Sequence, residues 1–159
     1  MITHTTMITV QKKPASQIYD WLLNLNRERY LKWHSDHRDY RVIHQTEHGV
    51  GSIFYFEEIL DNVRLNFQWE LVEFKKDEFI LTRAKFPYPI SLLLSMTEKD
   101  GNTEVKHELK LGFIHKRIAR VADWLVSQLI FTNKKAKALS RHALEEFKNL
   151  EHLELTIST

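Results

Sequence analysis

Strict alternation of apolar and polar residues between Leu65 and Leu71 is the feature that most constrains the fold of this chain. The apolar side chains of this stretch belong to Leu65, Phe67, Trp69 and Leu71, and every residue between them is polar. Successive side chains of a strand point to opposite faces, so this pattern predicts an antiparallel sheet with one packed and one solvated face. Other elements must therefore cover the apolar face.

A hairpin is predicted immediately before that strand. Asp61-Asn62 is typical of a two-residue turn, and the stretch from Ser52 to Leu60 reads as the preceding strand. In such a hairpin Glu58 faces Leu65 and points inward, while Glu57 points outward. A loop that is one residue longer or shorter would exchange the two glutamates. The sequence thus predicts a carboxylate on the inner face, where it is costly unless it is paired or binds a metal.

The remaining elements follow from the same periodicities. Further strands are predicted at Thr3 to Lys12, Tyr40 to His44, Glu78 to Lys85, Ile90 to Glu98 and Val105 to Phe113. Helical spacing predicts two short helices after Pro14, the second running from Arg27 toward His34, and a long final helix from His115 to Asn149. We therefore expect one α+β domain over residues 1–159, in which a curved antiparallel sheet wraps the long C-terminal helix.

Composition narrows the class of protein further. The length of 159 residues fits one compact domain. A net charge of +2, with basic and acidic residues interleaved, does not favour nucleic acid as a partner. The absence of cysteine excludes disulfides and thiolate ligands, so any metal must be bound through nitrogen and oxygen. We expect no membrane span and no signal peptide, and hence a cytoplasmic location.

Two segments far apart in the sequence carry the side chains of a candidate site. The first is Arg29-Tyr30-Leu31-Lys32-Trp33-His34-Ser35-Asp36-His37, which places two imidazoles where a helix is expected to end. The second is the pair His142 and Glu146, whose spacing on a helix brings the side chains within ~5–6 Å. Histidine and glutamate together suit zinc or a similar metal.

Each of these residues has a structural alternative. His142 and Glu146 also fit a surface ion pair on a helix. His34 and His37 also fit a polar helix end, where an imidazole satisfies terminal carbonyls. At most one of these two histidines need be a ligand, and His37 is preferred. His107 stands among apolar residues on the inner face of its strand, where it is either a core histidine or a group that moves protons.

The order of the elements resembles the START-like helix-grip superfamily, also called the polyketide cyclase and lipid-transport group. Pro14 and Trp21 in the first helix and the Gly49-Val50-Gly51 turn before a strand carry this resemblance together with the element order. It implies a deep apolar cavity between the sheet and the long helix. It also implies that the two short helices lie near the C-terminal end of that helix.

At the candidate site the chain is similar to a smaller branch, the zinc-dependent diacetylphloroglucinol and phloretin hydrolases. The matching residues are Arg29-Tyr30, Trp33-His34, Asp36-His37, Glu58 or Glu57, and His142 with Glu146. The resemblance implies zinc bound by His37, Glu58, His142 and Glu146, with His107 and Tyr30 as catalytic residues. From the residues themselves, Phe56, Phe67 and Trp69 are interpreted as core or as the wall of a substrate cavity, and His34 and Tyr88 are further candidates for substrate binding. The reaction implied is hydrolysis of a carbon–carbon bond next to a ketone on a phenolic ring.

Two other functions remain open from the sequence. The apolar inner faces also fit a non-enzymatic binding or carrier protein for a hydrophobic small molecule or lipid. A third possibility is a subunit-interaction module, with an exposed apolar rim near Phe86-Pro87-Tyr88-Pro89, and a homodimer is compatible with either.

Overall fold

The computed structural model describes residues 1–86, 88–112 and 132–155. Its strands are β1 (Ile2–Val10), β2 (His37–His44), β3 (Ile53–Leu60), β4 (Val63–Lys75), β5 (Phe79–Ala84), β6 (Ile90–Lys99) and β7 (Asn102–Leu111). Its helices are α1 (Ala15–Leu23), α2 (Arg27–Trp33) and α4 (Asn133–Asn149). The strands form one antiparallel sheet in the order β1-β7-β6-β5-β4-β3-β2. The predicted α+β arrangement, with two short helices after the first strand, is confirmed.

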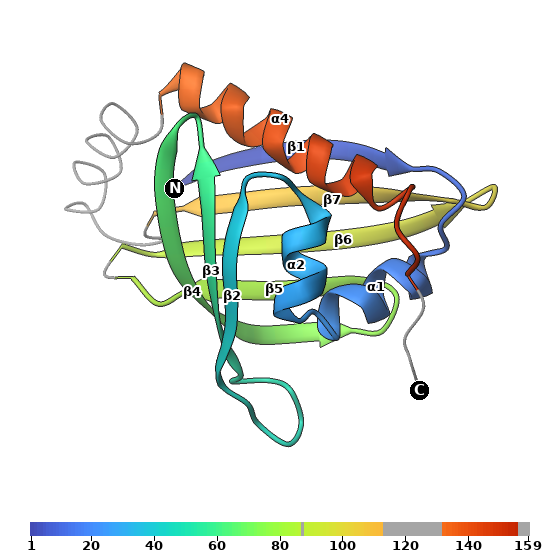
Figure 1. Ribbon diagram of the computed structural model, residues 1–159, viewed down its shortest axis with the longest axis horizontal. Helices are drawn as coiled ribbons and strands as arrows, with labels where there is room; N and C mark the ends of the chain where they lie inside the picture. Colours follow the sequence, from blue (N-terminus) through green and yellow to red (C-terminus); the bar gives the residue numbers. More distant parts are fainter. Residues whose placement is uncertain (87, 113–131, 156–159) are drawn as a thin grey trace.

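The helices are placed so that their ends meet at one side of the sheet (Figure 1). Helix α4 packs against β1 and also contacts β3, while α2 packs against β2. The two short helices and the C-terminal turns of α4 lie close together in this view. None of the helices within the described residues is long and apolar enough to cross a membrane.

An aromatic cluster fixes α2 against α4. The ring of Trp33 makes edge contacts with Trp21 at 5.0 Å and with Phe147 at 5.7 Å between centroids. The Nε1 atom of Trp33 donates a hydrogen bond to the backbone carbonyl of Glu146 at 2.6 Å. The amide of Asn149 donates in turn to the carbonyl of Trp33 at 2.9 Å. Full burial of one aromatic ring such as that of Phe147 contributes about 3 kcal/mol, so this junction is held firmly.

The β3–β4 hairpin has the predicted register. Glu58 faces Leu65 across the pair, and Leu60 faces Val63. Asp61 and Asn62 both have positive φ, 49° and 65°, as a type I′ turn requires. Glu58 therefore shares its face with Leu65, and Glu57 lies on the other face of the sheet.

The element boundaries differ from the prediction in two places that matter. Strand β2 begins at His37 rather than near Tyr40, so His37 opens a strand instead of ending a helix. Strand β4 continues to Lys75 through an irregularity in its pairing after Leu71, which a simple alternation does not predict. The predicted helix from His115 is described only from Asn133 onward, and its earlier part lies outside the described residues.

Candidate metal centre

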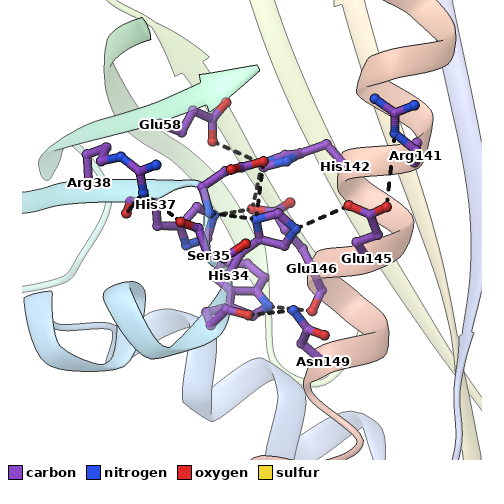
Figure 2. A network of polar contacts seen from close by, with 12 residues as sticks. His34, Ser35, His37, Arg38, Glu58, Arg141, His142, Glu145, Glu146 and Asn149 are labelled. Carbon is purple, nitrogen blue, oxygen red and sulfur yellow. Dashed lines mark hydrogen bonds and ion pairs between the residues drawn. The ribbon is translucent and has the colours of Figure 1, made fainter. Parts of the chain in front are cut away.

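Four predicted ligands from three elements converge at the junction of α2, the sheet and α4. His37 comes from β2, Glu58 from β3, and His142 and Glu146 from α4. One potential ligand atom from each residue lies within 4.8 Å of those of the other three. Figure 2 shows the four side chains pointing toward one another from these elements. The structure therefore brings together residues that are up to 109 positions apart in the chain.

The backbone explains why these side chains meet. His37 and Glu58 are directly paired across β2 and β3, so their side chains are neighbours on one face. His142 and Glu146 stand four residues apart on α4, so they lie one helical turn apart on one face. The helix junction at Trp33 brings the two pairs together.

One nitrogen of the His37 imidazole is hydrogen-bonded to the backbone. Its Nδ1 atom lies 2.7 Å from the carbonyl oxygen of Tyr30. A carbonyl can only accept, so Nδ1 carries the proton, and the neutral imidazole has its lone pair on Nε2. That Nε2 atom is 2.7 Å from Oε1 of Glu146, which is also an acceptor when ionised. The contact thus requires a proton or a metal cation between the two atoms.

His142 supplies the second nitrogen. Its Nε2 atom is 3.4 Å from Oε2 of Glu58 and 3.5 Å from Oε1 of Glu146, and it has no hydrogen-bond partner among the described residues. Burial lowers the pKa of His142, but the carboxylates of Glu58 and Glu146 outweigh that effect and raise it to about 9. At neutral pH this nitrogen therefore carries a proton between two carboxylates, and a metal cation would bind there by displacing that proton.

Glu146, the carboxylate of the His142–Glu146 pair on α4, stays ionised. Burial opposes ionisation of Glu146, yet the hydrogen bond from His37 and the charges of His142 and His37 hold its pKa below the ordinary value. Its side chain is only 13% exposed. The site thus contains a buried carboxylate that needs a positive partner.

The spacing of these atoms fits a divalent metal. Four atoms bound tetrahedrally at roughly 2.0–2.1 Å from one ion lie about 3.3 Å from each other. The contacts of His142 match this separation, at 3.4 Å and 3.5 Å, while the contact between His37 and Glu146 is shorter, at 2.7 Å. All the separations among the four atoms lie within 4.8 Å, so the atoms are close enough to be drawn onto one divalent ion. Two imidazoles and two carboxylates would also neutralise its charge.

His34 lies beside this cluster but has other partners. Its Nδ1 atom accepts a hydrogen bond from the backbone N–H of Asp36 at 3.1 Å. The neutral ring then carries its proton on Nε2, which lies 3.3 Å from Oε2 of Glu145. Its ring is 4.5 Å from that of His142, and these two form a second close group with His37. The nitrogens of His34 face the Asp36 backbone and Glu145, whereas Nε2 of His37 faces Glu146 within the four-residue cluster, so His37 is the better candidate ligand.

Tyr30 supports His37 directly. The two rings are stacked with centroids 3.8 Å apart and an angle of 7° between their planes. Burial, and secondarily the nearby carboxylate of Glu58, raises the pKa of Tyr30 well above its ordinary value. The hydroxyl therefore stays protonated, and it donates a long hydrogen bond, at 3.5 Å, to the backbone carbonyl of Glu57. Its catalytic role remains a prediction.

His107 is buried on the inner face of β7. It is 7% exposed, and its Nδ1 atom has no hydrogen-bond partner among the described residues. Burial lowers its pKa, and the nearby carboxylates of Glu146 and Glu58 only partly offset this effect. His107 is thus a neutral imidazole within the electrostatic reach of the cluster.

The predicted aromatic wall lies on the same face as Glu58. Phe56 is paired with Phe67, and Phe54 with Trp69, across β3 and β4. These four side chains are only partly buried. Phe56 contacts the ring of Tyr30 at 5.4 Å. Tyr88 is half-buried in the connection between β5 and β6, so its predicted contact with a substrate remains a prediction.

Sequence reasoning missed the role of two groups. The Tyr30 carbonyl orients His37, and the Trp33 indole holds α4 in place. No residue pattern identifies such contacts in advance, because a backbone carbonyl has no sequence signature. Glu57, the rejected alternative to Glu58, accepts hydrogen bonds from Tyr55 at 2.8 Å and from Arg64 at 2.6 Å on the opposite face.

Neither a protein-family model nor a curated protein matches the chain. Several solved structures have a similar fold. The crystal structure of TTHA0849 from Thermus thermophilus aligns with a TM-score of 0.68 and 11% identity, over 95% of each chain. The crystal structure of Ara h 8.0201 aligns with a TM-score of 0.64 and 11% identity, over 95% of this chain and 97% of that one. The solution structure of KanY protein aligns with a TM-score of 0.58 and 11% identity, over 95% of each chain.

At such low identity the likeness establishes architecture and leaves activity open. The shared architecture is the curved antiparallel sheet, the two short helices after the first strand and the C-terminal helix. This chain therefore has the helix-grip fold.

Proposed function

We propose that this protein is a zinc-dependent hydrolase that acts on a hydrophobic aromatic or polyketide-like ketone. The observation that carries the proposal is the convergence of His37, Glu58, His142 and Glu146, with ligand atoms within 4.8 Å of one another. Zinc bound there would polarise the ketone and lower the pKa of a water molecule toward ~7. Both effects are what hydrolysis requires.

The reaction class follows from the resemblance at the site. Water would add its hydroxide to the carbonyl carbon, the bond between that carbon and the aromatic ring would break, and the ring carbon would take a proton. The products are a carboxylic acid and the shortened arene, so atoms and charge balance.

The residues of this chain have separate parts in that reaction. Glu58 and Glu146 provide the negative charge that holds the cation. His107, a neutral imidazole because burial lowers its pKa, can accept or deliver the proton. The hydroxyl of Tyr30 can donate to an oxygen of the substrate or to Glu58. Phe56, Phe67 and Trp69 would lie against the aromatic ring.

Metal analysis tests the proposal first. Protein purified without a histidine tag should contain close to one equivalent of zinc, and zinc at 100 times its Kd should stabilise the metal-free protein by about 2.7 kcal/mol. For a chain of this size that corresponds to a rise in Tm of roughly 5–10 °C. His142→Asn should abolish the shift, whereas His152→Asn, which changes an exposed histidine outside the cluster, should preserve it.

Less than about a tenth of an equivalent of metal, together with no zinc-induced shift, would remove the basis of the proposal. With zinc bound, the release of a carboxylic acid from an aryl ketone should be lost in Glu58→Gln.

A non-enzymatic binding protein is the second candidate function. The half-buried aromatic side chains of Phe54, Phe56, Phe67 and Trp69 on the inner face of the sheet favour it. This function predicts that binding of an apolar ligand survives both chelation and His142→Asn. If the apolar ligand no longer bound once the metal had been removed, the result would favour the hydrolase instead.

A further inference from the structure

A hollow lies on the outer face of the sheet, which is the face opposite Glu58. Its volume is about 360 Å³, and its lining residues, which we call the arginine hollow, are Arg27, Arg38, Asp39, Glu57, Ile59 and Arg64. Asp39 is paired with Glu57 across β2 and β3. Ile59, two residues further along β3, is paired with Arg64 of β4. Paired residues point to the same side of a sheet, so these four side chains share the outer face.

Both carboxylates of the arginine hollow already have positive partners. Oδ1 of Asp39 accepts a hydrogen bond from Nε of Arg27 at 2.8 Å, and its Oδ2 lies 3.0 Å from Nε of Arg41, just outside the hollow. Oε1 of Glu57 accepts from Nε of Arg64 at 2.6 Å. The two negative charges of the hollow are therefore balanced by arginines that bind them directly.

Arg38 is held in place without an acidic partner. Its Nη1 atom donates to the backbone carbonyls of Ser35 at 2.6 Å and of His37 at 2.9 Å (Figure 2). Among the residues that the structure describes, no carboxylate forms an ion pair with it. A guanidinium has N–H groups on three nitrogens, so those on Nε and Nη2 of Arg38 remain available to a ligand.

The arginine hollow and its surroundings carry an excess of positive charge. Four arginines, counting the neighbouring Arg41, face two carboxylates, so the net charge is +2. A phosphate monoester carries roughly −1.5 to −2 charges at pH 7 and therefore balances this excess, whereas one carboxylate or sulfate balances only half of it. The planar fork of a guanidinium also matches two phosphate oxygens at once.

The size of the hollow limits the ligand to a small molecule. Its volume of about 360 Å³ is at the lower end of the ~300–1,000 Å³ that is usual for ligand sites. A phosphate group with a small organic substituent fits such a volume. Ile59 is half-buried in the hollow and offers an apolar contact to that substituent.

We propose that the arginine hollow binds the phosphate monoester group of a small ligand, with Arg38 as the main contact and Arg27 and Arg64 as further donors. The inference does not depend on the metal centre, because the hollow and Glu58 lie on opposite faces of the sheet. The protein therefore has a second binding site, which selects its ligand by charge.

The test uses the full chain after metal has been removed with a chelator and the chelator dialysed away, so that phosphate cannot bind to a metal ion. Isothermal titration compares phenyl phosphate with phenyl sulfate, which has the same ring and a lower charge. We expect phenyl phosphate to bind about 5-fold more tightly or better, because it accepts more charge-assisted hydrogen bonds. Arg38→Gln should weaken its binding by roughly 10–100-fold.

Arg83→Gln is the matched control. It removes the same charge from an exposed arginine on the outer face of the sheet, outside the hollow. In about 0.15 M salt it should change the affinity by less than about 2-fold, because distant surface charges are screened. Arg38→Lys keeps the charge without the planar fork and should bind with intermediate affinity. Should Arg38→Gln fail to fold, Arg27→Gln decides, with an expected loss of about 5-fold or more.

Equal weakening in Arg38→Gln and Arg83→Gln would show general attraction to a basic surface and would overturn the proposal. Equal affinity for the phosphate and the sulfate, or no binding of phenyl phosphate, would overturn it as well. Vesicles of phosphatidylcholine with and without phosphatidic acid, a lipid phosphate monoester, identify the source of the group. Arg38-dependent binding to these vesicles together with binding of phenyl phosphate supports a lipid ligand, and binding of phenyl phosphate alone supports a soluble ester.

Discussion

The imidazole of His37 lies flat on the ring of Tyr30, with centroids 3.8 Å apart, and donates a hydrogen bond to the backbone carbonyl of the same residue at 2.7 Å. One residue thus determines both the plane and the tautomer of the candidate ligand. Hydrogen bonds of this kind orient metal-binding histidines in many proteins.

Tyr30→Phe should retain zinc binding, because the stacking surface and the backbone carbonyl are both kept. Tyr30→Ala should weaken zinc binding by roughly 10–100-fold, the usual effect of losing support for a ligand. Competition with a chelating dye measures both affinities. An equal loss in the two variants would instead show that the hydroxyl, and not the ring, is needed.

Glu58→Gln should weaken zinc binding by more than the roughly 10–100-fold expected for a supporting residue, because it removes a charged ligand. Glu57→Gln is the matched control, since it makes the same change one residue away on the opposite face of the sheet. Metal titration of the two variants tests the choice between these glutamates. Comparable affinities for zinc would contradict the assignment of Glu58.

Trp33→Phe should destabilise the protein by about 1–2 kcal/mol. The substitution keeps an aromatic ring in the cluster but leaves the Glu146 carbonyl without the donor that Trp33 provides. Asn149→Ala should have a smaller effect, and the double variant should cost less than the sum, because both residues stabilise one junction. Denaturation in urea gives these differences. Strict additivity would mean that the two contacts act independently.

The stability of the metal-free protein should fall as the pH rises from neutral to above 9. The folded-state pKa of His142 is raised from 6.5 to about 9, so the protonated ring stabilises the folded state. This contribution is fully present below pH 6.5, declines above it, and is lost as the pH passes through about 9. Urea denaturation from neutral to alkaline pH with a chelator present tests this, with His142→Asn as the variant that should lack the decline.

Much of the fold follows from local patterns in the sequence. Asp61-Asn62 sets the register of the β3–β4 hairpin, and that register places Glu58 on the face of the sheet toward α4 and Glu57 on the opposite face, where Tyr55 and Arg64 bind it and it is buried. The spacing of His142 and Glu146 likewise fixes their common face on α4. These predictions succeed because turn chemistry and helical periodicity are properties of neighbouring residues.

Other features depend on contacts between distant segments. The choice between His34 and His37 depends on where β2 begins and on the partners of each imidazole, including the Asp36 backbone and Glu145 for His34. The position of α4 depends on the contact between Trp33 and Glu146, which are 113 residues apart. Packing decides these features, so no local pattern predicts them.

The two adjacent glutamates of β3 differ in whether their positively charged partners can lose that charge. Arginine does not lose its proton in proteins, so the Arg64 partner of Glu57 is a permanent cation. The inner glutamate, Glu58, faces the imidazole of His142, which exchanges its proton with solvent and can give up that place to a metal. The positive partner on one face of β3 is therefore permanent, whereas on the other face a metal ion can take the place of the His142 proton. Replacing His142 by arginine would make the inner balance permanent as well, and would close the site to metal while preserving its charge.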